Sequence, residues 1–288
     1  MMKTLYEQLE RRLRSACSTA KHPTNPCVLA VLEHLEAGGQ RVRAKICLDA
    51  AMRLALSESD AICLASACEL LHNASLIHDD LLDRTPTRRG APSIWEKYGD
   101  TVAVCAGDLL LSAAYRLLSE VSNAALIGPA LQLVHLRTEE LILGEAAETV
   151  TNADVSDTMS SYEQIAKGKS ASLLSLSLEL PLLLSGNADL QSLAHAAATE
   201  FAIAYQIADD FADVIQDARE GSPNLLRMLI ETERLTTSEA SAKAVELAEA
   251  RLASMQRLTD LLPNGCANLM LAQAEILRNA IAESMQAA

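Results

Sequence analysis

Helical periodicity is the feature that most constrains how this 288-residue chain can fold. Apolar residues recur every three to four positions through long stretches rich in Ala, Leu and Ser. Short groups of Gly, Pro or Asn interrupt these stretches near residues 22–26, 38–39, 84–92, 128–129, 152–157, 186–189, 220–224 and 263–265. About ten helices with short connections are therefore expected, and no strand series is evident. Because no linker is long or polar, we predict one all-α bundle over residues 1–288.

Composition narrows the classes of partner. Half of the chain is apolar, and 24 Lys and Arg stand against 38 Asp and Glu, a net charge of -14. A nucleic-acid backbone would meet net repulsion, so no nucleic-acid partner is expected. The seven scattered cysteines form no CxxC pair. With no apolar signal core at the N-terminus and no uncharged run long enough for a membrane span, we predict a soluble cytoplasmic protein.

The stretch LLHNASLIHDDLLDRTPTRRG combines apolar and acidic residues. Residues 57–83 are apolar nearly all round, which predicts a central helix surrounded by others. Asp79 and Asp83 share one face of that helix, and His72 and Ser75 precede them on the same stripe. Carboxylates in such surroundings are costly without a cationic partner.

A second stretch, FAIAYQIADDFADVIQD at residues 201–217, repeats the pattern with Asp209 and Asp213 on one face and Gln206 one turn earlier. Either DDxxD sequence alone fits a solvated helix face or a helix end as well as it fits a binding site. Together they predict one acidic pocket. Divalent cations would relieve the electrostatic repulsion between its carboxylates. Mg²⁺ is held by one or two carboxylates together with phosphate oxygens, which predicts a bound diphosphate. An EF-hand is disfavoured because its ligands lie on a loop.

Basic residues could bind such an anion. Arg88 and Arg89 follow the first acidic motif, and GGQRVR places Arg41 and Arg43 after a double glycine. Arg guanidinium groups bind phosphate oxygens bidentately. Lys169 opens an apolar run and is a further candidate. Ordinary surface charge remains the alternative for each of them.

These segments resemble a known family. HNASLIHDDLLDRTPTRRG, YQIADDFAD, GGQRVR, AGDLLLSAA and KGKSASLL are similar, in order and approximate spacing, to segments of the trans-isoprenyl diphosphate synthases, the polyprenyl synthetase family. The resemblance covers residues 38–217. It implies a helical bundle of the isoprenoid synthase type around a central cavity, usually as a homodimer. It also implies Mg²⁺-dependent condensation of an allylic diphosphate with isopentenyl diphosphate into linear polyprenyl diphosphates.

The resemblance implies roles for individual residues. The metal ligands would be Asp79, Asp83, Asp209 and, through water, Asp213, with Asp80 and Asp210 orienting them; Asp79, Asp83, Asp209 and Lys169 would be the catalytic set. The substrate-binding set would be Arg88, Lys169 and Ser170 on the allylic diphosphate side, Arg43, His72 and Arg89 for isopentenyl diphosphate, and Gln206 near the reacting carbons. From the residues alone, a core histidine bonded to a neighbouring helix is the alternative for His72.

Departures from the family pattern leave alternatives open. Gln40 stands where GGKRxR has lysine, and no lysine occurs between Lys169 and Lys243, although Arg219 or Arg227 could substitute. A terpene cyclase that uses the same ionisation, or a non-catalytic partner subunit of a prenyl synthase, are the other candidates.

Product length depends in this family on residues one turn before the first motif. In this sequence they are Ala74 and Ser75, which are small. We therefore expect products of C20 or longer, although small residues at these positions could instead serve close helix packing.

Overall fold

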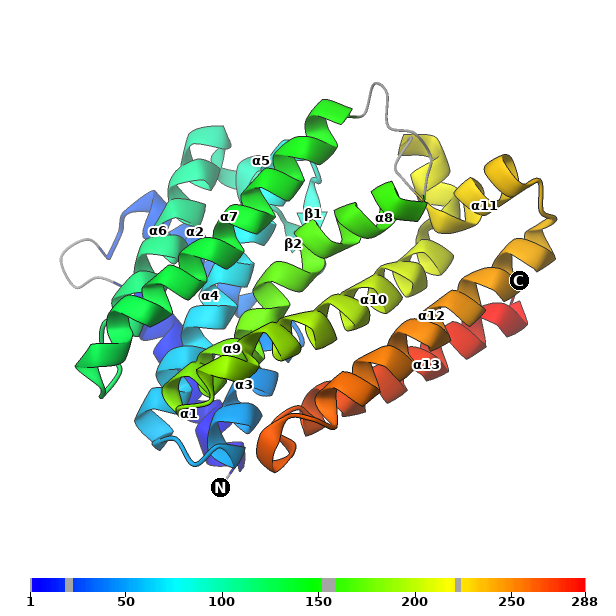
Figure 1. Ribbon diagram of the computed structural model, residues 1–288. Helices are drawn as coiled ribbons and strands as arrows, with labels where there is room; N and C mark the ends of the chain where they lie inside the picture. The colour runs from blue at the N-terminus through cyan, green and yellow to red at the C-terminus, as the bar shows by residue number, and fades with distance from the viewer. Residues whose placement is uncertain (1, 19–22, 152–158, 221–223, 288) are drawn as a thin grey trace. The chain divides into compact units, whose positions relative to one another are not determined.

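The computed structural model describes residues 2–18, 23–151, 159–220 and 224–287, without the side chains at 147–151, 161, 165, 169, 215–220 and 284–287. Within these residues the regular secondary structure is helical except for one short hairpin, which confirms the predicted all-α class (Figure 1). The chain divides into two compact units, Met1–Leu133 with Leu180–Asn187, and Val134–Glu179 with Ala188–Ala288. That the whole chain acts as a single domain stays a prediction.

The first unit is built around a long helix. Its elements are α1 (Met2–Cys17), α2 (Pro26–Glu36), α3 (Val42–Arg53), α4 (Glu58–Leu82), β1 (Thr87–Arg88), β2 (Ala91–Pro92), α5 (Ile94–Tyr98), α6 (Asp100–Leu118), the 3₁₀ turn η1 (Ala124–Leu126) and the start of α7 (Ile127–Thr151).

The helix α4 is the predicted central helix. Ser57 caps its N-terminus by accepting a hydrogen bond from the Asp60 amide, and acidic residues occupy its first turn, where they complement the helix dipole. Residues from Asp60 to Asn73 are buried almost without interruption. The helices α1, α3 and α6 pack against α4. Each fully buried Leu or Ile contributes about 1.5–3 kcal/mol, so this packing fixes α4 firmly.

The helix α6 is apolar as well as long. By length and composition it is the one helix of the described residues that could span a membrane, with a mean hydropathy of 1.4 over its most apolar window. A buried core helix passes the same test, and 44% of that window is buried. The helix also carries Asp108 and Arg116.

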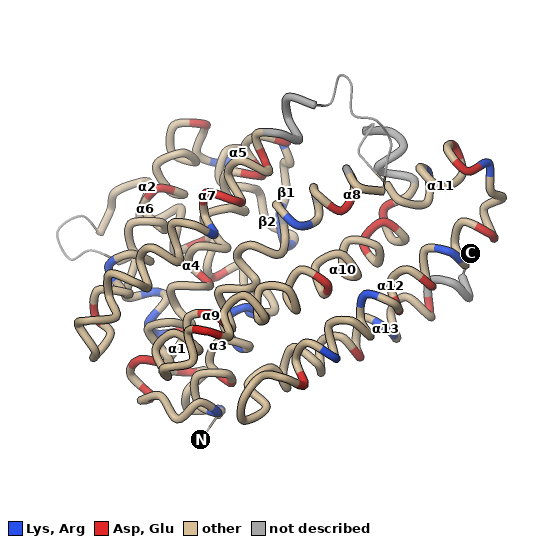
Figure 2. Tube along the Cα trace, viewed as in Figure 1, with Lys and Arg blue, Asp and Glu red and all other residues tan. Residues whose placement is uncertain are grey.

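The second unit contains the rest of α7, α8 (Met159–Ala166), a π-helical turn η2 (Lys167–Ala171), most of α9 (Ser172–Leu184), η3 (Ala188–Leu190), α10 (Gln191–Glu220), α11 (Leu225–Glu233), α12 (Thr237–Thr259), η4 (Pro263–Gly265) and α13 (Asn268–Ala287). Both α12 and α13 pack against α10, and charged residues are spread along α12 and α13 (Figure 2). A capping box of Thr236 and Glu239 begins α12.

Candidate active site

Three carboxylates of the first acidic motif stand at the C-terminal end of α4. Asp79 and Asp80 lie in its last turn, Asp83 is the C-cap, and the last turn contains no basic residue. The C-terminus of a helix carries a partial negative charge, so this position is electrostatically unfavourable for anions. Cations supplied from elsewhere must therefore stabilise this end of α4.

Arg88 supplies one such cation. Its Nε and Nη2 both lie 2.7 Å from Oδ1 of Asp80, and Nη2 lies 3.4 Å from Oδ2 of Asp79. Asp80 is 2% exposed, against 21% for Asp79. Burial raises the pKa of Asp80, and the Arg88 guanidinium opposes that shift. Asp80 is therefore committed to Arg88, which leaves Asp79 and Asp83 as the more accessible members of the motif.

A small hairpin positions Arg88, and the sequence predicted only a break in this region. The two central residues of its turn, Arg89 and Gly90, both have positive φ, 54° and 77°. Two-residue hairpin turns of this kind favour glycine, which accounts for the G of RRG. Ser93 Oγ and Trp95 Nε1 donate to the carbonyl of Thr85 at 2.7 and 2.9 Å and tie the hairpin down.

Arg89 extends to the double glycine that precedes α3. Its Nη1 donates to the carbonyl of Gly38 and lies 3.4 Å from Oδ1 of Asn73. A Cβ on Gly39 would stand 2.7 Å from Cζ of Arg89. Glycine is thus required at position 39 by the guanidinium beside it as well as by its φ of 129°.

Arg43 and His72 form the other predicted basic pair. Arg43 Nη1 lies 3.2 Å from Nε2 of His72. Burial, followed by the charges of Arg43 and Arg89, lowers the pKa of His72 well below its usual value. The ring is neutral, and since the guanidinium can only donate, Nε2 is the acceptor. His72 thus belongs to a cationic cluster made of Arg43, His72, Arg88 and Arg89, which we call the basic cluster.

Two residues beside the basic cluster were missed from sequence. His34 Nε2 lies 3.1 Å from Oδ1 of Asn73, whose Nδ2 donates to the carbonyl of Glu69 at 2.7 Å. Burial, reinforced by Arg89, lowers the pKa of His34 to about 4. Asn73 directly follows His72, which is the one signal that could have indicated it.

Arg41 does not join the basic cluster. It is buried and bonded to Glu10 at 3.0 Å and to the carbonyl of Leu35 at 2.6 Å, with Glu69 3.4 Å away. Its role is structural.

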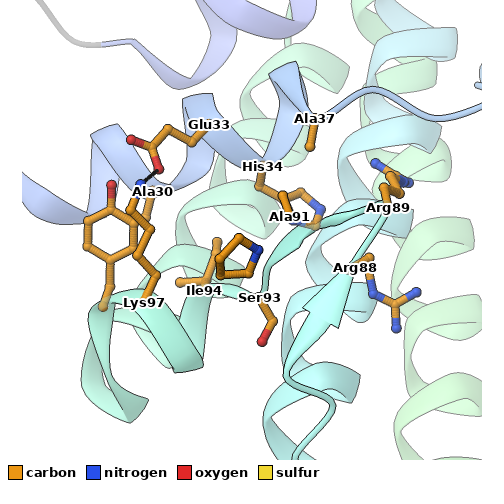
Figure 3. Close-up of a pocket in the computed structure, with 12 residues that line it drawn as sticks. Ala30, Glu33, His34, Ala37, Arg88, Arg89, Ala91, Ser93, Ile94 and Lys97 are labelled. Atoms are coloured by element: carbon orange, nitrogen blue, oxygen red, sulfur yellow. Dashed lines mark hydrogen bonds and ion pairs between the residues drawn. The ribbon is translucent and has the colours of Figure 1, made fainter.

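A pocket of about 80 Å³ lies beside the hairpin, between α2 and α5 (Figure 3). Ala30, Ala37, Pro92 and Ile94 give it apolar walls, and His34, Arg88 and Arg89 line it as well. At one side Lys97 Nζ and Glu33 Oε2 form an exposed ion pair at 2.6 Å.

The second acidic motif lies on α10 in the second unit. Asp210 is 1% exposed and accepts hydrogen bonds from the Leu225 amide at 2.7 Å and from Gln206 Nε2 at 3.0 Å. Asn224, which caps α11, donates to the carbonyl of Asp210 at 2.9 Å. Asp213 is exposed and Asp209 is half-buried. As in the first motif, the middle aspartate is buried in hydrogen bonds while its neighbours are more accessible.

Lys169 and Ser170 lie in the π-helical turn η2. The side chain of Lys169 lies outside the described residues, as does that of Arg219. A Cβ on Gly168 would stand 3.1 Å from Cα of Gly144, so the pair of glycines lets α7 approach this turn closely. Single π turns inside helices are frequent at functional sites.

The carboxylates of each motif can supply part of the coordination of a Mg²⁺ ion, with the remaining oxygens coming from a bound ligand. Within the ranges that the structure describes, no three His, Cys, Asp or Glu side chains are gathered to hold a metal by themselves. Mg²⁺ keeps several waters and needs one or two carboxylates plus phosphate oxygens, and the two outer carboxylates of each motif match that requirement.

Comparisons with known proteins agree with the family resemblance of these motifs. Residues 25–224 match the family model described as polyprenyl synthetase. The chain is 33% identical over 177 residues to a (2E,6E)-farnesyl diphosphate synthase of Mycobacterium tuberculosis, covering 61% of this chain and 49% of that protein. It is 34% identical over 195 residues to a chloroplastic geranylgeranyl pyrophosphate synthase of Capsicum annuum, covering 65% of this chain and 53% of the other.

The matched part of the chain thus spans about half the length of these curated relatives. Among solved structures, a geranylgeranyl pyrophosphate synthetase from the archaeon Geoglobus acetivorans superposes with a TM-score of 0.87 at 22% identity, covering 96% of this chain and 98% of that chain. This likeness shows that the chain has the fold of those structures. Because the family model matches residues 25–224, well over half of the chain, the chain belongs to the polyprenyl synthetase family.

Proposed function

We propose that this chain is a Mg²⁺-dependent trans-prenyltransferase that condenses an allylic diphosphate with isopentenyl diphosphate into linear polyprenyl diphosphates. One observation carries the proposal. In one unit, the carboxylates at the negative end of α4 stand beside the basic cluster of Arg43, His72, Arg88 and Arg89. A magnesium–diphosphate requires both kinds of group, anions for the metal and cations for the phosphate oxygens.

The metal ligands in this proposal are Asp79, Asp83, Asp209 and Asp213. Asp80 and Asp210 orient these neighbours, because each is buried and held by hydrogen bonds of its own. Arg88, Lys169 and Ser170 contact the allylic diphosphate. When bound, Mg²⁺ supplies positive charge that stabilises the diphosphate leaving group.

The basic cluster, apart from Arg88, would receive the second substrate. Arg43, Arg89 and neutral His72 bind the diphosphate of isopentenyl diphosphate, and a neutral ring can donate or accept a hydrogen bond without adding repulsion. Gln206 lies beside the reacting carbons.

The reaction then breaks one bond and forms another. Cleavage of the allylic C–O bond releases diphosphate and leaves an allylic cation. The isopentenyl double bond attacks that cation, a new C–C bond forms, and the proton that is lost passes to the released diphosphate. The apolar helices around the acidic motifs exclude water, which would otherwise capture the cation.

Product length, assembly and location complete the proposal. Small Ala74 and Ser75 precede the first motif, and we infer products of C20 or longer. Ala74 is 1% exposed, whereas Ser75 is half-buried and donates through Oγ to the His72 carbonyl at 2.8 Å. Replacing Ser75 with Phe should therefore shorten the product series, as measured by chromatography of the dephosphorylated alcohols. A homodimer is expected from the family resemblance, and a cytoplasmic location stays the prediction made from the sequence.

The test is incubation of purified protein with Mg²⁺, an allylic diphosphate and labelled isopentenyl diphosphate, followed by sizing of the dephosphorylated products. Label in linear alcohols supports the proposal. Unlabelled cyclic hydrocarbon would instead identify a terpene cyclase. No product from the chain alone, together with a changed turnover or product length of an added prenyl synthase, would identify a partner subunit. The exposed position of Gln40 beside the double glycine makes Gln40→Lys a useful companion, with a lower KM for isopentenyl diphosphate expected.

A further inference from the structure

His78, the residue immediately before the first acidic motif, is packed against α6 in an unusual way. A Cβ built on Gly107 would stand 2.1 Å from Nε2 of His78, with Cδ2 and Cε1 at 2.5 and 2.6 Å. The edge of the imidazole ring thus occupies the space that a side chain at position 107 would need. Gly107 is buried, so the ring sits in a notch of the α6 backbone.

Polar contacts reinforce this packing. His78 Nε2 lies 3.4 Å from the carbonyl of Val104 and 3.9 Å from Oδ1 of Asp108, both one turn or less from Gly107 on α6. Such contacts are individually weak, and the Asp108 side chain is 66% exposed. The steric fit to the notch is therefore the dominant contact.

We propose that His78 is a positioning residue, whose ring, seated on Gly107, fixes the last turn of α4 and thereby the outer carboxylates Asp79 and Asp83. This inference rests on the proposed function for its catalytic part. The last turn of a helix has unpartnered carbonyls and frays readily, and here it also carries three like charges. An anchor on a neighbouring core helix restricts that motion.

The AGD sequence of α6 gains a physical reason from this contact. Gly in a helix interior costs about 1 kcal/mol relative to Ala, so its presence at 107 needs an explanation. Here the explanation is that α6 has no room for a side chain where His78 crosses it. By contrast Gly128, near the start of α7, has nothing within 4 Å of its Cβ position.

The first test is a double-mutant cycle in thermal unfolding, without substrate or metal. Gly107→Ala alone should lower Tm by about 5 °C or more, because the methyl group displaces the ring. His78→Ala with Gly107→Ala should be no less stable than His78→Ala alone, since the new methyl group then fills vacated space. Gly128→Ala is the matched control and should leave Tm unchanged or slightly raised.

The second test measures positioning rather than stability. In His78→Ala, the Mg²⁺ concentration for half-maximal turnover should rise several-fold, while KM for isopentenyl diphosphate stays unchanged because the basic cluster is intact. His78→Gln, which keeps a donor near Val104, should recover part of the loss. Additive losses of Tm in the double variant would overturn the packing claim, and an unchanged Mg²⁺ dependence would overturn the positioning claim.

Failure of the proposed function gives a different outcome. If the unmodified protein makes no labelled polyprenyl product, the prenyltransferase assignment is wrong. The unfolding cycle still decides whether His78 and Gly107 are coupled, because it requires no turnover.

Discussion

At the scale of single residues, the three aspartates of each acidic motif differ in burial and in hydrogen bonding. Asp80 is paired with Arg88, and Asp210 accepts from Gln206 and from the Leu225 amide. A buried carboxylate needs such donors, whereas a metal ligand must stay accessible. The spacing DDxxD therefore gives one structural carboxylate and two that can share a ligand.

Arg88 is the residue whose removal should affect this division most directly. Arg88→Lys retains a charge but loses the Nε contact to Asp80, so both the buried carboxylate and the proposed diphosphate contact suffer. We expect a loss of roughly 10- to 100-fold in kcat/KM for the allylic substrate, corresponding to about 1.4–3 kcal/mol. Steady-state kinetics measures it. Arg53→Lys, which changes an exposed arginine paired with Asp49, is the control and should retain turnover.

His34 should make folding stability depend on pH. Its pKa is about 4 in the folded protein against 6.5 normally, so the unfolded chain binds the proton more readily. The stability that neutral His34 contributes to the folded state is complete above pH 6.5 and is lost as pH falls towards 4. The free energy of unfolding changes by an amount on the order of 3 kcal/mol over this range. The free energy of unfolding, measured with denaturant, should differ less between pH 7 and pH 4.5 for His34→Gln than for the unmodified chain. Exposed His135→Gln should leave that difference intact.

At the scale of elements, short turns position several of the basic groups, whereas both acidic motifs lie on helices. The hairpin of β1 and β2 holds Arg88 and Arg89, the double glycine admits Arg89, and the π turn carries Lys169. The glycines in RRG and GG indicate turns at the hairpin and at the double glycine already in the sequence. The hairpin itself was not predicted, because two-residue strands are too short to show an alternating pattern.

The double glycine allows a matched comparison. Ala at either position is strained, since φ is 86° at Gly38 and 129° at Gly39, but only at Gly39 does the Cβ meet the Arg89 guanidinium. Gly39→Ala should therefore raise KM for isopentenyl diphosphate several-fold beyond any effect of Gly38→Ala, with kcat less affected. Equal KM values for the two variants would show that Arg89 does not need this space.

At the scale of the whole molecule, the proposal requires both acidic motifs for one activity. The motifs lie in different units, on α4 and on α10. Local hydrogen bonds explain the arrangement inside each motif. The proposed cooperation of the two motifs has to be tested on the complete chain.

Ligand-induced stabilisation tests that cooperation. Mg²⁺ with inorganic diphosphate should raise Tm of the unmodified protein by mass action, and Asp79→Ala and Asp209→Ala should each remove most of the increase. Glu283→Ala, an exposed acidic change on α13, serves as the control. If the increase in Tm survives in either aspartate variant, the two motifs bind ligands independently. If either variant retains near-normal turnover, the metal assignment is refuted.

The sequence by itself determined the helical class, the central position of residues 58–82 and the chemical character of both motifs, because these follow from periodicity and from local spacing of charges. Tertiary structure decided the individual roles within the motifs. Arg41 looked equivalent to Arg43 in GGQRVR, yet it is buried against Glu10 and Glu69. His34 and Asn73 lie beside the basic cluster, although the sequence pattern did not indicate them. The reason is physical: hydrogen bonding and steric fit are set by residues distant in sequence, and a glycine such as Gly107 shows its purpose only beside the ring that crosses it.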